Sequence, residues 1–269
     1  MGKLAGYGLI GAIVALGMLG LGYWAGTSST EMPATAAAHG DDASGGQIAG
    51  LDEAIRSYLL ANPEVLIEVQ ESLQAKQEEA QRVAQLSAIT DESAAIFQSA
   101  SDAVIANPDG AVTMVEFFDY NCGYCKRALD DMNAMIGEDK DLRFVLKGFP
   151  ILGPDSHAAH VVSEAFKMMM PEKYLDFHRQ LLGDGGRADE ARAIKVAVSL
   201  GADEAELRQK MTDPQIEENF RETYQLADAL GITGTPSYVV ADEVVFGAVG
   251  TDTLIQKVEN ARSCGSTVC

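Results

Sequence analysis

Two cysteines separated by two residues are the side chains of this sequence best suited to covalent chemistry. Cys122 and Cys125 follow an apolar run over 112–118 and precede a helix-like stretch that begins at Lys126. The first turn of a helix has unpaired N–H groups and a partial positive charge, and both stabilise a thiolate. We therefore expect Cys122 to be an attacking thiolate with a lowered pKa and Cys125 to be the resolving thiol. The pattern predicts thiol–disulfide exchange.

A second mark of such a site is Thr235-Pro236, which stands just before another strand-like run. Proline is tolerated at the start of a strand, and we expect a cis bond here, opposite Cys122. A cis bond would leave the Thr235 backbone free to pair with a substrate chain, and the Pro236 ring would keep metal off the thiols. Gly123 and Tyr124 lie between the two cysteines, where they would tune the thiolate and complete the predicted substrate-binding set.

Glu116 lies in the otherwise apolar run before Cys122. Alternation along a strand places it on the same face as Val112 and Met114. A buried carboxylate at this position could relay a proton to Cys125, whereas an exposed carboxylate at a sheet edge would have no such role. The sequence leaves both interpretations open.

The remaining cysteines, Cys264 and Cys269, allow a competing interpretation in which all four thiols bind zinc or copper. The strand and helix around the first pair favour redox chemistry instead. The second pair is then most simply a short structural disulfide, with a second redox pair as the alternative. His157 and His160 share a helix face but have no evident third ligand, so we expect packing or surface histidines, no metal and no cofactor.

The charge of the chain excludes one class of partner. Its 269 residues include 40 acidic and 20 basic side chains, which give a formal net charge of −20. Proteins that bind nucleic acid need a basic surface, so we expect no nucleic-acid partner.

The N-terminus has the composition of a membrane-spanning segment. The stretch 4–24 has no charged residue, and as a helix it would be about 32 Å long at 1.5 Å per residue, enough to cross a bilayer. Lys3 precedes it and acidic residues follow it, which keeps the start cytoplasmic and places the rest outside. We expect residues 1–25 to be an uncleaved anchor, with a cleaved signal peptide as the alternative. In both cases the body lies in an envelope compartment where disulfides persist.

Two accessory regions follow the predicted anchor. Residues 26–50 are rich in Ala, Gly, Ser and Thr and predict a flexible linker. Residues 51–100 predict a helical extension in which Asn62 caps a long helix that begins at Pro63. The thin apolar stripe of that helix predicts either packing on its own domain or a homo-oligomer through residues 51–89.

The main domain, over 103–262, has the pattern of an α/β fold. Strands at 112–119 and 142–149 flank the helix that starts at the cysteines, which predicts a βαβ unit with parallel strands. A helical insertion occupies about 155–232 and contains no strand candidate.

The end of the chain completes the pattern. A hairpin turns at Asp242, Thr251 caps a last helix to about Arg262, and residues 263–269 form a cysteine-containing tail. This order of elements is that of a thioredoxin-like fold with a helical insertion, preceded by N-terminal helices and a transmembrane helix.

Three stretches of the sequence resemble the DsbA family of periplasmic thiol–disulfide oxidoreductases: 115–125, 147–156 and 231–236. The stretch 58–66 resembles the N-terminal helix of the ScsC-like branch, whose members can oligomerise through this region and act as isomerases. The resemblance implies that Cys122 is the nucleophile, Cys125 the resolver, Glu116 the buried acid and 235–236 the cis-proline turn.

The resemblance also implies secreted or periplasmic protein substrates and a membrane redox partner, either oxidising or reducing. We expect an enzyme anchored in the inner membrane with its catalytic domain in the periplasm, or a periplasmic enzyme if the N-terminus is cleaved. Two features depart from the family core, the Cys264/Cys269 pair and the anchor, and they leave the redox partner open.

Overall fold

The computed structural model describes residues 50–269, which divide into two compact units, one ending at Pro63 and the other beginning at Glu64. The described part of the first unit is helix α2, Leu51–Ala61, and none of its side chains is buried. At its end the Asn62 side chain donates from Nδ2 to the Tyr58 carbonyl at 2.8 Å. The prediction that Asn62 caps the start of the next helix is therefore wrong, because this side chain donates to a carbonyl group in the last turn of the preceding helix.

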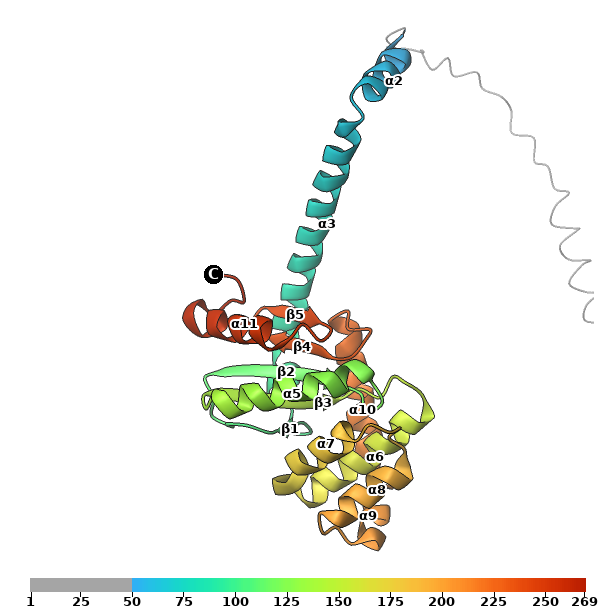
Figure 1. Cartoon of the computed structure of the whole chain (residues 1–269), viewed down its shortest axis with the longest axis vertical. Helices are drawn as coiled ribbons and strands as arrows, with labels where there is room; N and C mark the ends of the chain where they lie inside the picture. The colour runs from blue at the N-terminus through green and yellow to red at the C-terminus, as the bar shows by residue number, and fades with distance from the viewer. Residues whose placement is uncertain (1–49) are drawn as a thin grey trace, which may run out of the picture. The chain divides into compact units, whose positions relative to one another are not determined.

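The second unit begins with helix α3, Glu64–Asp91 (Figure 1). Ile89 is the one buried residue of this helix. The predicted apolar stripe consists of Leu66, Val69, Leu73, Ala80 and Val83. Its large side chains stay more than half exposed, as Leu66 at 56% and Leu73 at 54% show. The second unit covers α3 only near its C-terminal end, where α3 contacts the last strand of the sheet. Most of the stripe is therefore left without a partner in this unit.

No helix within residues 50–269 combines the length and the apolar character needed to cross a bilayer. The predicted anchor over 1–25, and the predicted linker up to residue 49, lie outside the described residues.

A five-stranded sheet in the order β1–β3–β2–β4–β5 forms the centre of the second unit. Its strands are β1 (Ala103–Val104), β2 (Val112–Phe118), β3 (Leu142–Gly148), β4 (Ser237–Val240) and β5 (Glu243–Phe246). The β2 and β3 strands pair in parallel, as the βαβ pattern predicts, and β4 and β5 form the predicted antiparallel hairpin. The short β1, which the sequence did not indicate, pairs antiparallel with β3.

The helices of this unit after α3 are α4 (Ser93–Phe97), α5 (Gly123–Glu138), α6 (Pro154–Met169), the 3-10 turn η1 (Pro171–Lys173), α7 (Tyr174–Gly183), α8 (Glu190–Ser199), α9 (Glu204–Lys210), α10 (Pro214–Ala229) and α11 (Thr251–Cys264). The run from α6 to α10 is the expected helical insertion between β3 and β4. Thr251 does not cap α11 as predicted, since it is the first residue of the helix and its hydroxyl donates to Asp131 on α5 at 2.5 Å.

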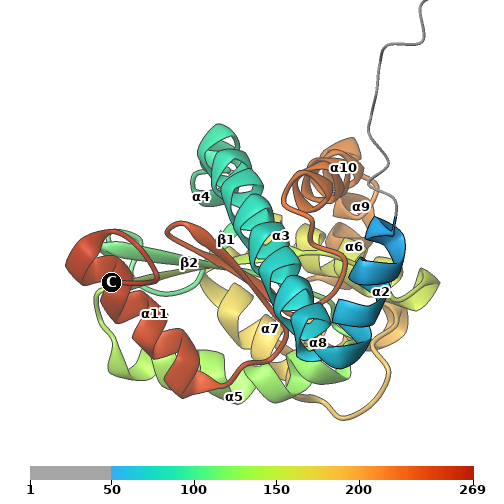
Figure 2. The same ribbon diagram turned by 90° about the horizontal axis from the view of Figure 1, so that it is seen from above.

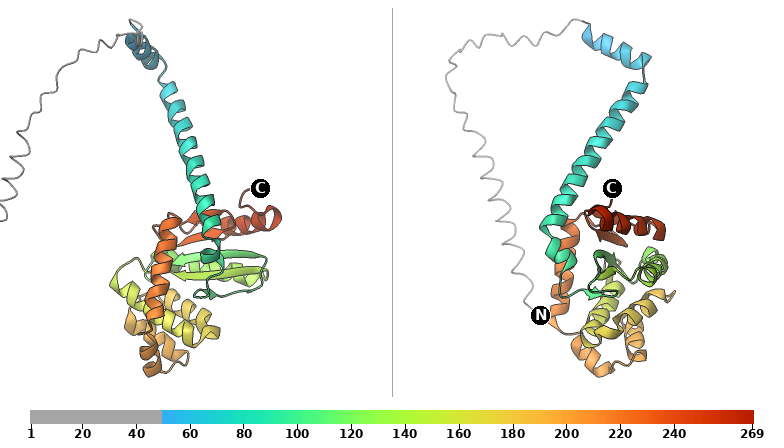
Figure 3. Two further views of the ribbon diagram at one scale, coloured as in Figure 1. Left: turned by 180° about the vertical axis from the view of Figure 1, so that it is seen from behind. Right: turned by 90° about the vertical axis from the view of Figure 1, so that its left-hand side faces the viewer.

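Helices cover both faces of the sheet, and each face has its own apolar cluster (Figures 2 and 3). One face buries Met114 and Phe118 of β2 with side chains of α5, α7 and α11. The other buries Val115 and Phe117 with side chains of α4 and α10. A strand buried on both faces is apolar at nearly every position, which explains why a carboxylate at Glu116 is conspicuous in β2.

Candidate functional site

Cys122 is the N-cap residue of α5, with extended backbone angles. Its Sγ accepts a hydrogen bond from the Cys125 backbone N–H at 3.4 Å. Both cysteines are free thiols in this structure. Cys122 is 6% exposed and Cys125 is fully buried, so only the first sulfur has a path to solvent.

The two thiols have opposite acidities. Hydrogen bonds lower the pKa of Cys122 to about 5 against the effect of partial burial; the largest comes from the Cys125 side chain, and the Thr235 side chain and the N–H groups of Cys125 and Tyr124 add to it. Burial raises the pKa of Cys125 far above its ordinary value, and the neighbouring Cys122 sulfur and Glu116 carboxylate raise it further. At neutral pH the pair is therefore one thiolate and one thiol, which share a hydrogen bond.

The Thr235–Pro236 peptide bond is cis and faces the first cysteine. The Thr235 carbonyl oxygen lies 3.1 Å from Cys122 Sγ. Ser237, the first residue of β4, fixes the turn by donating from its hydroxyl to the Gly234 carbonyl at 2.8 Å. The turn before β4 thus places the half-buried Thr235 directly beside the thiol.

Glu116 lies in β2, between β3 and β4, and is 2% exposed. The alternative of an exposed carboxylate at a sheet edge is wrong, because β2 is an interior strand. Burial, together with the charges of Cys122 and Asp131, raises the pKa of Glu116 to about 8. This carboxyl group is consequently protonated at neutral pH.

A buried carboxylate just ahead of the cysteines, Asp119, holds the loop after β2 and was not singled out from the sequence. Its Oδ2 accepts the backbone N–H groups of Ile151 and Leu152 at 2.9 and 3.0 Å. Its Oδ1 accepts the Ser156 hydroxyl at 2.8 Å and the Asn121 N–H at 2.7 Å. Four donors from three segments thus converge on one side chain, which fixes where α5 begins.

Two more contacts hold the same loop. The Asn121 amide pairs with the Ala188 backbone in both directions, each bond at 2.8 Å. His160 Nε2 accepts the Tyr120 N–H at 3.3 Å, so the predicted packing histidine also anchors the loop. A Cβ on Gly148 would lie 2.7 Å from His160 Nδ1, which explains why glycine ends β3. Asp119, Asn121, Gly148 and Ser156 had no sequence signal beyond their place in stretches that resemble a known family, and Ala188 had none.

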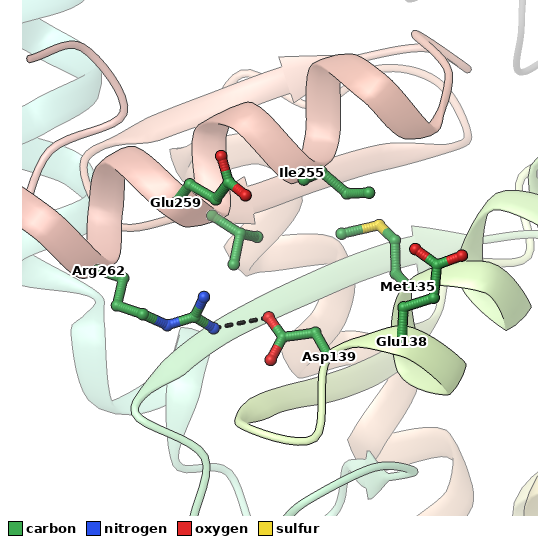
Figure 4. Close-up of a pocket in the computed structure, with 7 residues that line it drawn as sticks. Met135, Glu138, Asp139, Ile255, Glu259 and Arg262 are labelled. Carbon is green, nitrogen blue, oxygen red and sulfur yellow. Dashed lines mark hydrogen bonds and ion pairs between the residues drawn. The ribbon is translucent and has the colours of Figure 1, made fainter.

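The structure does not bring the four cysteines together. Cys264 and Cys269 form a disulfide at the end of α11. Thr251 at the start of α11 contacts Asp131, and Arg262 near its end is paired with Asp139 just past α5, at 2.6 Å (Figure 4). α11 therefore runs along α5 away from Cys122. Within residues 50–269 no three His, Cys, Asp or Glu side chains are grouped so that they could hold a metal ion.

Comparison with known proteins points to the same kind of site. The model of the DSBA-like thioredoxin domain family covers residues 113–259, more than half of the chain. The chain belongs to this family. A second model, for the copper resistance protein ScsC N-terminal domain, covers residues 49–80. The protein is thus a DsbA-family member with an ScsC-like N-terminal region.

Solved structures confirm the thioredoxin-like α/β fold. A thioredoxin-like oxidoreductase from Silicibacter pomeroyi DSS-3 is 36% identical, with a TM-score of 0.61, and covers 64% of this chain and 98% of its own. A linker-deletion mutant of ScsC from Proteus mirabilis is 26% identical, with a TM-score of 0.63, and covers 80% of this chain and 94% of its own.

Among curated proteins, disulfide bond formation protein D of Bacillus subtilis is 27% identical over 169 residues, which are 58% of this chain and 75% of that protein. Three mycobacterial proteins named Na(+)/H(+) antiporter NhaA 1 match at 25% identity, but the matched region is only 27% of their length. The DsbA-like and ScsC relatives identify this DsbA-family chain as a thiol–disulfide oxidoreductase.

We predict that Asp119→Ala lowers the free energy of unfolding by about 3 kcal/mol, because four donors lose a charged acceptor. Urea unfolding measures the change. Asp130→Ala is the matched control: this exposed aspartate on α5 should change stability by less than about 0.5 kcal/mol. An Asp119→Ala variant as stable as the control would show that this carboxylate does not hold the loop.

Proposed function

We propose that this enzyme exchanges disulfides with secreted protein substrates, with Cys122 as nucleophile and Cys125 as resolving thiol. The observation that carries the proposal is the asymmetric pair at the start of α5, in which a slightly exposed sulfur of low pKa rests on a fully buried thiol. A reactive cysteine needs both access and a stabilised thiolate. Cys122 has both.

The substrate chain would bind beside the cis turn. An extended peptide that pairs with the backbone of the half-buried Thr235 would bring its own cysteine to Cys122. The Thr235 carbonyl oxygen and Cys122 Sγ are only 3.1 Å apart. Tyr124, 59% exposed and covered on one side by Arg127 at 4.1 Å, supplies an apolar surface next to the thiol. Gly123 carries no side chain between the cysteines, which leaves room for the approaching chain.

Substrate oxidation then proceeds in two exchanges. A substrate thiolate attacks Cys122 in the disulfide form of the site, and the bond to Cys125 breaks. Cys125 leaves as a thiolate and takes the proton of Glu116, which is neutral below about pH 8. A second substrate thiolate then attacks the mixed disulfide, forms the substrate disulfide and releases Cys122. Because the released thiolate is stabilised, the reduced site is favoured and the disulfide form is an oxidant.

The exposed stripe of α3 supports self-association through residues 51–89. Side chains such as Leu66, Val69 and Leu73 stay exposed on the part of α3 that its own unit does not cover, and the ScsC N-terminal domain match overlaps this segment. An oligomer would present several active sites to one substrate and so favour isomerisation.

The uncharged stretch 4–24, followed by acidic residues, supports an inner-membrane anchor, a periplasmic catalytic domain and a redox partner in the membrane.

We predict that the protein reactivates a scrambled multi-disulfide substrate in glutathione buffer. Cys122→Ser should abolish both reactivation and simple dithiol oxidation, because the sulfur left at the site, Cys125, is fully buried and stays protonated. Cys125→Ser should accumulate mixed disulfides that non-reducing electrophoresis detects. Full activity of Cys122→Ser would contradict the proposed nucleophile.

The same assay separates oxidation from isomerisation. A double variant, Leu66→Asp with Leu73→Asp, places charges in the stripe without touching the site, and should keep dithiol oxidation while it loses most reactivation. Reactivation that survives in a variant shown to be monomeric by sedimentation would contradict the role of the oligomer.

We predict that Glu116→Gln slows substrate oxidation at pH 7 by about tenfold or more, because the leaving Cys125 thiolate loses its acid. The acid form of Glu116 exists below about pH 8 and disappears above it. The wild-type rate divided by the variant rate should therefore be high at pH 6–7 and fall as pH rises through about 8. Stopped-flow oxidation of a dithiol peptide gives both rates, and their ratio cancels the titration of the peptide thiols. A ratio constant with pH would contradict the proton transfer.

A further inference from the structure

The second cysteine pair has features of a redox substrate as well as of a structural bond. Cys264 is the last residue of α11, and Gly265 follows it with a left-handed φ of 79° that ends the helix. The chain then turns back so that Cys269 closes a short loop over residues 264–269. Both cysteines are exposed, so another protein can reach either sulfur.

Contacts other than the disulfide hold this loop in place. Asp242, in the β4–β5 turn, accepts the Ser266 hydroxyl at 2.7 Å, and it accepts the Thr267 N–H and hydroxyl at 2.8 and 3.1 Å. The Asn260 side chain donates to the Thr267 carbonyl at 2.8 Å, and Thr267 is 5% exposed. These bonds do not require the disulfide. After reduction they would keep the two thiols close, and closing the ring again would cost little entropy.

The two cysteine pairs have opposite electrostatic settings. Cys122 caps the N-terminus of α5, where the helix dipole stabilises a thiolate. Cys264 ends α11, where the unpaired carbonyl groups of the last turn disfavour a negative charge. A pair whose thiolate is disfavoured is more stable as a disulfide, and a pair whose thiolate is stabilised is more stable reduced. Electrons should therefore move from the loop dithiol to the active-site disulfide.

One molecule cannot carry out this transfer within itself. α5 has 16 residues, so it is about 24 Å long at 1.5 Å per residue. Cys122 lies at its start, whereas Arg262, two residues before Cys264, is paired with Asp139 just past its end (Figure 4). The oxidant of the loop must come from another molecule.

We propose that the Cys264/Cys269 pair is a substrate of the Cys122/Cys125 site of a second copy of this chain, so that mature copies install the loop disulfide in new ones. The proposal rests on the proposed function of Cys122 and Cys125. The substrate of that site is then a dithiol in a short loop at the end of a helix, carried by another copy of the chain.

The exchange balances without another reagent. The Cys269 thiolate, which is outside the helix, attacks Cys122 of the second copy, and the Cys122–Cys125 bond breaks. The Cys264 thiol loses its proton and attacks Cys269, which closes the loop disulfide and releases Cys122 as a thiolate. Two electrons and two protons leave the loop: the electrons reduce the active site of the second copy, Cys125 gains one proton, Cys122 stays a thiolate and the other proton goes to solvent.

Two full-length variants test the transfer. The donor carries Cys122→Ser and Cys125→Ser and is reduced at its loop; the acceptor carries Cys264→Ser and Cys269→Ser and is oxidised at its active site. They are mixed in equal amounts without oxygen, quenched with acid, alkylated and analysed by mass spectrometry. We expect the loop to become oxidised and the acceptor site reduced in equal amounts, with equilibrium favouring these products by more than about tenfold.

Controls separate the possible failures. The oxidised acceptor is also mixed with dithiothreitol. If it oxidises dithiothreitol but leaves the loop reduced, the inference is overturned and the proposed function stands; if it oxidises neither, both fail. A donor that also carries Asp242→Asn keeps its cysteines but loosens the loop, so the mixed disulfide should last longer before the ring closes. Closure as fast as in the parent donor would contradict the positioning role of Asp242.

Discussion

The negative charge on Cys122 depends on donors that the first turn of α5 directs at a single sulfur atom. Those donors can act only if the loop before the helix is fixed, and Asp119 fixes it by joining three segments of the chain. The sheet supplies the other side of the site, because β4 pairs with β2 and begins at the cis turn. Burial of Cys125 then ensures that only one of the two sulfurs is charged.

The same burial that makes the pair asymmetric also changes the acidity of Glu116. In an interior strand covered on both faces, a carboxyl group without a paired cation keeps its proton at neutral pH. Cys122, by contrast, is close enough to the surface and to N–H donors for the charged form to be preferred. One site thus holds a thiolate, a thiol and a neutral acid on a strand and the helix that follows it, and the protonation of each depends on its burial and its hydrogen-bond donors.

The local part of this site was predictable from sequence and the long-range part was not. A strand, two spaced cysteines and a helix are adjacent in the chain, so their spacing alone indicates their geometry. Asn121 and Ala188, by contrast, are 67 residues apart, and His160 is 40 residues from Tyr120. The caps predicted at Asn62 and Thr251 were wrong for a related reason, since each side chain has a partner that propensity does not reveal. Whether Glu116 lay at an edge or inside depended on β4, which is more than a hundred residues later.

We expect Cys122 to be a thiolate at neutral pH, and the ultraviolet absorbance of the thiolate in the reduced active site measures this directly. The Cys264–Cys269 disulfide does not titrate, and Cys125 stays protonated throughout the range. Absorbance should therefore rise in a single step as pH increases, with its midpoint at about pH 5, and Cys122→Ser should remove the step. A midpoint near the pKa of a free cysteine, about 8.5, would show that the first turn of α5 does not stabilise the Cys122 thiolate.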